Sequence, residues 1–341
     1  MTIFYVLIAI LVFGLLIFIH ELGHFLFAKK FGVAITEFSL GMGPKLFSKT
    51  GKDGIIYSIR AFPIGGFVSM VGETDESDNP NAFNKKPAYQ RFIITIAGAV
   101  MNLLLGLIVM FILTTTNSVF GTTKIGEFSK DATSNQALML EDEIIKVGNT
   151  RVHTSSELSY EIMRKGYEPI SITVIRDGNK ITLDNVVFPQ ISSDGIVFGS
   201  IDFLVYGEDR TFSTIIKNSY YSSKSTIKMI WDSLYDLITG RYGMEQVSGP
   251  IGVTGAITNA AKTSTYSLFY LVVVISMNLG IFNLLPIPAL DGGSLLLIII
   301  EMIIRRPIPQ KIDYGIKAIG FLLLMGFAIL VTFKDIIFLF R

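Results

Sequence analysis

Apolar residues along the chain gather into four long runs that more polar segments separate. The runs cover residues 3–27, 92–116, 267–300 and 315–338. Each run is long enough to cross about 30 Å of hydrocarbon as a helix. The third is interrupted at residues 286–293 (PIPALDGG), where two prolines and two glycines exclude a continuous helix. The pattern predicts a multi-pass α-helical membrane protein with about four transmembrane helices, the third of them broken.

Residues 55–70, between the first two runs, are apolar for a connecting segment. Their pattern predicts a β-hairpin that turns at residues 62–66 (FPIGG). One interpretation is a membrane-associated hairpin that dips into the bilayer near the first run. The other is a small surface hairpin packed on the helices. We favour the first.

From about residue 121 to 205 the composition is that of a soluble mixed α/β domain. Alternating residues 170–175, a tight turn at Asp177-Gly178 and a second strand follow one another, while residues 155–165 have a helical pattern. About 85 residues can close one small core. We therefore expect an inserted α/β domain at 119–205. His153 lies there and is interpreted as a surface residue, not a metal ligand.

Residues 212–238 place apolar side chains at helical spacing with charged residues between them, which predicts an amphipathic helix or two. This helix either lies on the outer membrane interface, with Trp231 as an anchor, or packs on the soluble domain. We favour the interface. The expected domains are an N-terminal membrane half, the α/β domain, an interfacial helix region and a C-terminal membrane half, at residues 1–118, 119–205, 206–262 and 263–341.

Composition narrows the range of functions. The chain is 50% hydrophobic and 17% charged, against about 25% charged residues in ordinary globular domains. Its net charge of +1 gives no positive field that would recruit nucleic acid, so nucleic-acid partners are set aside. Cysteine is absent. Disulfides, thiolate metal sites and cysteine nucleophiles are therefore excluded, and histidine, aspartate and glutamate remain as metal ligands.

Basic residues indicate the orientation in the membrane. They concentrate in the first and last connections, at Lys29, Lys30, Lys45, Lys49, Lys52, Arg60, Lys85, Lys86 and Arg91, and at Arg305, Arg306 and Lys311. Both connections are therefore expected in the cytoplasm, and the termini and the inserted domain outside it. Residues 1–19 carry no charge and no cleavage pattern follows them, so we expect the first run to stay as a span and not to be a removable signal peptide.

The main chemical signal is the HExxH motif at residues 20–24, inside the first apolar run. His20 and His24 share one helix face at this spacing and can hold one zinc ion, while Glu21 can take a proton from metal-bound water. Each ionisable residue near a bilayer centre costs roughly 2.5 to 3.5 kcal/mol, so it needs a partner or a purpose. The motif predicts a hydrolytic zinc site at membrane depth.

A catalytic zinc takes three protein ligands and leaves one position for water. We choose Asp291 as the third ligand. At about 1.5 Å per helical residue, His20 lies about 13 Å from Lys29 and Asp291 about 20 Å from Arg305, so both lie toward the cytoplasmic half. The alternative for Asp291 is a helix cap after a proline-rich turn.

Five segments resemble the site-2 protease family of intramembrane zinc metalloproteases, and most closely its bacterial RseP/RasP class with one PDZ domain. They are HELGHFLFAKKFGV, FSLGMGPKLF, GGFVSMVGE, VSGPIGV at 247–253 and NLGIFNLLPIPALDGG at 278–293. The resemblance covers nearly the whole chain in the same order. It implies His20, His24 and Asp291 as zinc ligands and Glu21 as the catalytic base.

The resemblance also implies how substrate is held. Asn283 would hold the substrate backbone, and the hairpin near 55–70 would pair with substrate as an added strand. We assign Gly65, Gly66 and Asn102 to the same substrate-binding role. An unwound transmembrane segment needs such partners, because unsatisfied N–H and C=O groups cost several kcal/mol each in lipid.

The chain departs from the family pattern at three places. It reads GAVMN at 98–102, where the family commonly has Gly-Pro before the asparagine, and Ser294 follows the LDGG sequence where a basic residue or histidine is usual. The expected α/β domain keeps a D-x-I-x-x-V core at 142–147 but lacks the usual Gly-Leu and Pro-Gly steps. The first two departures remove no ligand, and the third weakens the expectation of a peptide-carboxylate pocket.

We therefore expect a zinc endopeptidase of a bacterial cytoplasmic membrane that cuts single-span membrane proteins near the inner face, after another protease has cut them outside. By resemblance, its substrates would be an anti-sigma factor or signal-peptide remnants, and the PDZ-like domain would act as a size filter or a plain spacer. Two alternatives stay open. One is a membrane metal transporter, and the other is a non-catalytic receptor whose PDZ-like domain binds peptide and whose metal site is structural.

Overall fold

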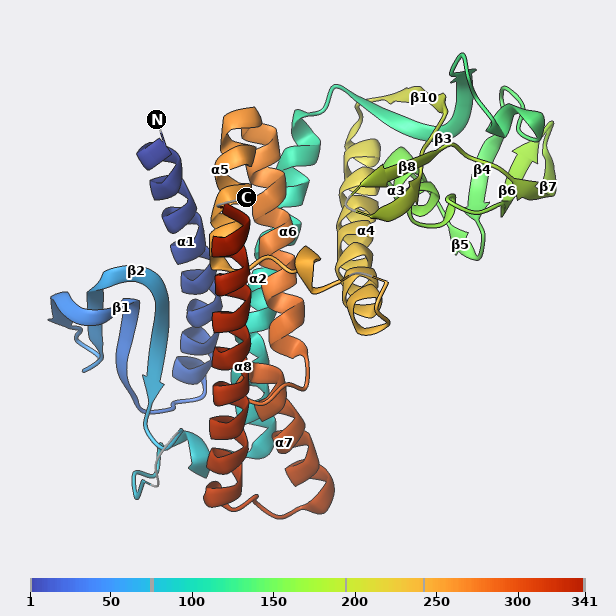
Figure 1. Cartoon of the computed structure of the whole chain (residues 1–341). Helices are drawn as coiled ribbons and strands as arrows, with labels where there is room; N and C mark the ends of the chain where they lie inside the picture. Colours follow the sequence, from blue (N-terminus) through green and yellow to red (C-terminus); the bar gives the residue numbers. More distant parts are fainter. Residues whose placement is uncertain (1, 74–76, 194, 242, 340–341) are drawn as a thin grey trace. The chain divides into compact units, whose positions relative to one another are not determined.

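The structure is a computed structural model that describes residues 2–73, 77–193, 195–241 and 243–339 (Figure 1). The chain divides into two compact units. Met1–Val109 together with Gly243–Arg341 form one, here called the helical unit, and Met110–Tyr242 form the other, here called the inserted unit. The inserted unit extends beyond the α/β domain expected at 119–205, because it also contains the helix that follows that domain.

Long apolar helices dominate the helical unit. Its helices are α1 (Thr2–Lys30), α2 (Ala88–Thr116, which continues into the inserted unit), α5 (Pro250–Thr263), α6 (Thr265–Leu284), α7 (Asp291–Ile304) and α8 (Gln310–Leu339). Within the described residues, four segments are long and apolar enough to cross a membrane: Phe4–Lys30, Ala88–Thr116, Thr265–Leu284 and Lys311–Ile337. The prediction of about four membrane-spanning helices is confirmed on length and composition.

The third apolar run is broken where the sequence predicts it. α6 ends at Leu284 and α7 begins at Asp291, and the residues between them form no helix. Pro286 and Pro288 supply no backbone N–H for helical bonding, and Ala289 has a left-handed backbone with a φ of 74°. The break places Asp291 at the first helical position of α7.

α5 is a helix that the sequence pattern does not predict as part of the membrane half. We expected an interfacial region up to residue 262, but α5 belongs to the helical unit and packs against α1, α6 and α8. Gly249, at its N-cap, has no side chain to satisfy the first turn. Asp335 of α8 does so instead, because it is buried and accepts a hydrogen bond of 2.8 Å from the Gly252 N–H.

The predicted hairpin pairs differently from our expectation. Residues 55–70 do not fold back on themselves at 62–66, because Ile56–Met70 form one strand, β2, whose antiparallel partner is β1 (Ile35–Thr50). Residues 37–40 of β1 pair with 66–69 of β2 on one side and with 56–59 on the other. The two halves of β2 are therefore separated by β1. The strand at 35–50 was not predicted, so its place between them was missed.

Aromatic contacts hold this curled hairpin against α1, and a charged cluster inside the hairpin joins its strands. Phe38 stacks on Phe25 of α1 at 4.7 Å, and Figure 1 shows the hairpin beside the lower half of α1. Burial alone would raise the pKa of Glu37, but hydrogen bonds from Ser58 and Arg60, with Lys45, outweigh it and lower the pKa to about 2. A group of large apolar side chains stays exposed on the hairpin: Met42, Leu46, Phe47, Ile59 and Phe62.

The inserted unit contains the predicted mixed α/β structure. Its strands are β3 (Val119–Phe128), β4 (Glu143–Val147), β5 (Thr150–Arg151), β6 (Ile170–Arg176), β7 (Asn179–Val186), β8 (Gln190–Ser193), β9 (Ile196–Gly199) and β10 (Phe203–Asp209). The main sheet has the order β10-β3-β4-β6-β7, with β5 paired to β4. α3 (Ser155–Lys165) is the helix predicted at 155–165. The strand, turn and strand predicted near 170–183 are confirmed as β6 and β7.

The amphipathic helix predicted at 212–238 is α4 (Phe212–Ile238), and it belongs to the inserted unit. One face packs along α3 through ion pairs: Arg164 with Asp236 at 2.6 Å and Lys228 with Glu161 at 2.9 Å. The less favoured alternative, packing on the α/β domain, therefore describes this face. Trp231 is exposed and remains available for the expected interfacial role.

Candidate metal centre

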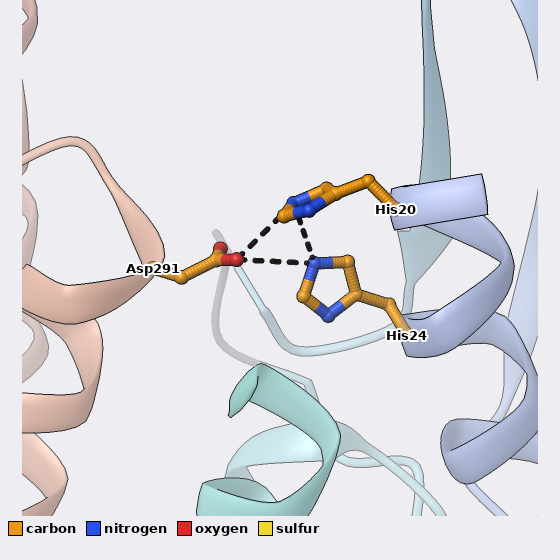
Figure 2. A group of neighbouring side chains, drawn as sticks. All are labelled: His20, His24 and Asp291. Atoms are coloured by element: carbon orange, nitrogen blue, oxygen red, sulfur yellow. Dashed lines mark hydrogen bonds and ion pairs between the residues drawn. The ribbon is translucent and has the colours of Figure 1, made fainter. Parts of the chain in front are cut away.

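Three of the predicted site residues meet at one point of the helical unit. His20 and His24 lie one turn apart on α1 and are buried, and Asp291 reaches them from the start of α7. Figure 2 shows the two imidazoles projecting from α1 toward the Asp291 carboxylate. Among the described residues, these three form a group whose ligand atoms lie within 4.8 Å of one another.

The distances between the ligand atoms fit zinc. The Nε2 atoms of His20 and His24 are 3.2 Å apart, and Oδ2 of Asp291 lies 3.2 and 3.3 Å from them. Ligands about 2.0 Å from a tetrahedral zinc ion are separated from one another by about 3.3 Å. This nearly equilateral triangle of two nitrogens and one oxygen therefore matches one face of a zinc tetrahedron.

The surroundings of one carboxylate oxygen support the same assignment. Oδ2 of Asp291 is buried, and its polar neighbours among the described residues are the two imidazole nitrogens, which can donate to it only when they carry a proton. A buried carboxylate oxygen without a donor is costly unless a cation or a proton compensates it. The residues present therefore fit a divalent metal, with His20, His24 and Asp291 as its protein ligands.

Asp291 is not the N-cap residue of α7, which was the alternative role considered for it. Leu290 occupies the N-cap position of α7, and Asp291 is already inside the first turn. Its carboxylate turns toward the histidines of α1. The non-helical residues 285–290 allow this orientation, because α6 ends before them and α7 begins directly after them, at Asp291.

Close packing of α1 on α2 shapes the site from behind. A Cβ on Gly23 would lie 2.4 Å from the carbonyl oxygen of Ala97, and a Cβ on Gly98 would lie 2.4 Å from Nε2 of His24 and 2.8 Å from Cε1 of His20. Two helices approach this closely only where side chains are absent. Gly98 was noted in the sequence only as part of a departure from the family pattern, and its contact with both imidazoles was missed.

Hydrogen bonds on the far side of each ring orient the histidines. The Nδ1–H of His24 donates to the carbonyl oxygen of Ile94 at 2.8 Å, which leaves Nε2 free for a metal. Nδ1 of His20 lies 3.4 Å from the side-chain amide of Asn102 and 3.4 Å from that of Asn283. Sequence reasoning missed the Ile94 carbonyl, since every residue has one and no side-chain pattern marks it.

Glu21 connects α1 with the hairpin. Its Oε2 accepts a hydrogen bond of 3.1 Å from the backbone N–H of Val68 in β2. A cavity of about 690 Å³ opens beside the ligands, and His20, Glu21, His24 and Asp291 are among the residues that line it. Charged residues farther along its wall, including Arg91, Glu301 and Lys317, make a polar space that water can enter.

The four residues expected to bind substrate differ in how deeply they are buried in the protein. Gly65 and Gly66 lie in β2, close to Val68, and Asn283 lies in the last turn of α6 with its side chain partly exposed. Asn102 is completely buried in α2, with its amide against His20. In this structure its side chain faces the metal site and not a surface that substrate can reach.

The fold and the site together define a class: a metal-dependent hydrolase that has two of its ligands on a helix long and apolar enough to cross a membrane. Comparison with known proteins agrees. A family model described as peptidase family M50 matches residues 8–327. A candidate zinc metalloprotease of Clostridium perfringens is 36% identical over 337 residues, which cover 98% of this chain and 99% of the relative.

Two more distant relatives have similar coverage. The zinc metalloprotease RasP of Geobacillus kaustophilus is 29% identical over 412 residues, covering 96% of each protein. The regulator of sigma-W protease RasP of Bacillus subtilis is 28% identical over 413 residues, covering 96% of this chain and 97% of the relative. The chain belongs to peptidase family M50, and it is a zinc metalloprotease.

Proposed function

We propose that this protein is an intramembrane endopeptidase that hydrolyses peptide bonds within the transmembrane segments of single-span proteins. The observation that carries the proposal is the triangle of His20, His24 and Asp291, with Glu21 beside it on one cavity wall. Two of the ligands and Glu21 lie on α1, which is apolar and long enough to cross a membrane. This location supports cleavage of peptide bonds at membrane depth.

Zinc, when bound to these three ligands, polarises the scissile carbonyl and makes water acidic enough to be deprotonated near neutral pH. Glu21 is the proton carrier. Its Oε2 takes the proton from the attacking water and then delivers it to the leaving nitrogen. The hydrogen bond from the Val68 N–H holds this oxygen on the cavity side of α1, so the base is positioned before substrate arrives.

The edge of β2 supports substrate binding by strand addition. Residues 66–69 of β2 pair with β1 on one side, and the Val68 N–H donates to Glu21, which supports the assignment of this N–H to the opposite edge. Backbone groups that face one edge recur at every second residue, so those of Gly66 face the same side. An unwound substrate segment can add to this edge and satisfy its own N–H and C=O groups there. Substrate would then lie directly beside Glu21.

The exposed apolar side chains of the hairpin favour its membrane-associated interpretation over a purely surface one. Phe47 and Phe62 are 73% and 60% exposed, and large exposed apolar patches mark contacts with protein or lipid. The charged cluster around Glu37 holds the hairpin in its curled form. Asn283 is proposed to hold the substrate backbone from the other side of the site.

The proposal also includes the class of substrate and the membrane in which the protein lies. One relative is named for the regulation of sigma-W, which supports an anti-sigma factor as substrate, with signal-peptide remnants as a second class. The inserted unit would be PDZ-like and extracytoplasmic, and it would admit only proteins already shortened by another protease. The basic connections support a metal site toward the cytoplasmic side of a bacterial cytoplasmic membrane.

A cleavage assay with matched variants tests the proposal. The purified protein in detergent is incubated with a small panel of single-span substrates, and its zinc content is measured in parallel. Glu21→Gln is expected to keep zinc and abolish cleavage, because the amide cannot accept the proton. His24→Ala is expected to lose both. Cleavage by the Glu21→Gln protein would rule out the assigned base.

The two alternatives make different predictions. A metal transporter moves ions across liposome membranes and cuts no peptide. A non-catalytic receptor holds zinc without an open position, so its function would survive loss of Glu21 and Asn283. The cavity beside the ligands favours the protease, because it leaves space for water and a polypeptide next to the metal position.

A further inference from the structure

His20 has a chemical requirement that its surroundings must meet. A neutral histidine that binds a metal through Nε2 carries its proton on Nδ1, and this proton needs an acceptor. For His24 the acceptor is the Ile94 carbonyl oxygen, 2.8 Å away. For His20, the polar atoms described near Nδ1 belong to the amides of Asn102 and Asn283, each 3.4 Å away through Nδ2.

Two N–H groups cannot bond to each other, so an amide must present its oxygen when His20 holds a metal. A half-turn of an asparagine amide exchanges Nδ2 and Oδ1 with little change of shape. Asn102 is suited to this turn, since its Oδ1 is buried and has no hydrogen-bond partner among the described residues. Rotation would bring that oxygen to the His20 proton.

Asn102 is enclosed where α2 packs against α6. The residue is 0% exposed, and its carbonyl oxygen accepts a hydrogen bond of 2.8 Å from Ser276 Oγ of α6. Asn283, by contrast, is partly exposed at the end of α6. One proton needs one acceptor, so the sealed amide serves His20 and the accessible amide stays available to substrate.

We propose that Asn102 is a positioning residue, whose side-chain oxygen accepts the Nδ1 proton of His20 and so directs Nε2 to the metal. This rests on the proposed zinc-dependent function. It replaces the substrate-binding role that we first expected for Asn102. The residue acts through His20 and touches neither substrate nor reacting atoms.

The test compares metal binding among variants of the full-length protein in detergent. Asn102→Leu keeps the side-chain size but removes the acceptor, while Asn102→Asp keeps an acceptor. Ser276→Ala is the matched control, because it removes the bond between α2 and α6 without touching His20. The readouts are the rate of zinc release to a chromophoric chelator and the visible spectrum of the cobalt-substituted protein.

We expect Asn102→Leu to weaken zinc binding by about 10- to 100-fold, as loss of such outer hydrogen bonds commonly does, and to change the cobalt spectrum. Asn102→Asp should stay close to wild type in affinity, and Ser276→Ala should keep both properties. Should the leucine variant fail to fold, Asn102→Ala is measured in its place.

Unchanged zinc release and an unchanged cobalt spectrum in Asn102→Leu would overturn the proposal, and so would an equal loss in Asn102→Leu and Asn102→Asp. The proposed function fails separately, through a wild-type protein that holds no zinc or cuts no substrate. The role of Asn102 is decided by the zinc-release rates of the variants relative to the wild type, and not by their cleavage activity.

Discussion

Gly98 is a residue whose lack of a side chain makes room for two of the proposed metal ligands. It lies on α2 directly behind the imidazoles, and an added methyl group would lie 2.4 Å from Nε2 of His24. That nitrogen is a proposed metal ligand, so the ring cannot move aside without leaving the metal. The site thus depends on the absence of a side chain as much as on the presence of three.

Gly98→Ala is expected to lower zinc affinity at least about tenfold, in the range found for other outer-shell changes, and to reduce cleavage with it. Gly255→Ala is the matched control, since Gly255 also lies inside a helix but has open space around its Cβ position. Alanine favours a helix over glycine by about 1 kcal/mol, so the control should keep zinc and be slightly more stable. Zinc analysis and thermal unfolding measure both effects. Full zinc occupancy in Gly98→Ala would contradict the packing argument.

The hairpin of β1 and β2 depends on a charged cluster as well as on apolar packing. Glu37 accepts a hydrogen bond of 2.8 Å from Arg60 and one of 2.6 Å from Ser58, and it pairs with Lys45 at 2.9 Å. These partners come from other segments of the two strands. Glu37 therefore ties the curled hairpin together at the point where β1 has β2 on both sides.

Glu37→Gln should make residues 56–60 exchange amide hydrogens faster near neutral pH, because the charge-assisted bonds are lost. The folded pKa of Glu37, about 2, lies below the ordinary value of 4.5. Its ionised form therefore stabilises the fold above about pH 4.5, and that stabilisation is lost as the pH falls toward 2. The difference in amide exchange rate between the wild type and Glu37→Gln should therefore become smaller as the pH falls from about 4.5 toward 2.

Hydrogen exchange followed by mass spectrometry measures this effect peptide by peptide. Lys49→Gln is the control, since it removes one charge from an exposed position of the same hairpin. Equal protection of residues 56–60 in wild type and Glu37→Gln at neutral pH would show that apolar packing alone holds the hairpin.

The molecule consists of two units with separate apolar cores. The helical unit contains the complete metal centre, and the inserted unit has its own apolar core around Ile144, Leu158 and Ile172. In the inserted unit, α4 is held to α3 by Arg164 and the buried Asp236, which form two hydrogen bonds of 2.6 and 2.9 Å. Damage to this pair should affect the inserted unit first.

Asp236→Ala would remove two hydrogen bonds from the guanidinium of Arg164 and leave it the ion pair with Asp232 at 3.3 Å, at a cost of about 1 to 3 kcal/mol. We expect earlier thermal unfolding and faster proteolysis within residues 110–242, with zinc content unchanged. Asp184→Ala, at an exposed position of β7, should change neither. Loss of zinc in Asp236→Ala would mean that the metal centre depends on the inserted unit.

The features that could be predicted from the sequence are those that neighbouring residues determine. The long apolar runs, the break at the two prolines and the HExxH spacing each follow from neighbouring residues. The meeting of Asp291 with the histidines needed a depth argument, because 267 positions separate it from His24. The curled pairing of β1 and β2 was missed, since residues 35–50 lack a clear alternating pattern.

Backbone contacts were also beyond the reach of sequence reasoning. The Val68 N–H on Glu21 and the Ile94 carbonyl on His24 are backbone groups, which the identity of a side chain does not mark. The membership of α5 in the helical unit was not predicted either. Its apolar residues alternate with polar ones such as Thr254, Thr258 and Asn259, so the pattern does not indicate a membrane helix. Its position depends on packing against three other helices.

Location of the metal tests the central claim most directly. Crystals of the wild-type protein, measured on both sides of the zinc absorption edge, should give one anomalous peak about 2 Å from His20 Nε2, His24 Nε2 and an Asp291 carboxylate oxygen. Asp291→Asn should lower or remove the peak. A zinc peak elsewhere, or an Asp291 carboxylate turned away from the two imidazoles, would contradict the account.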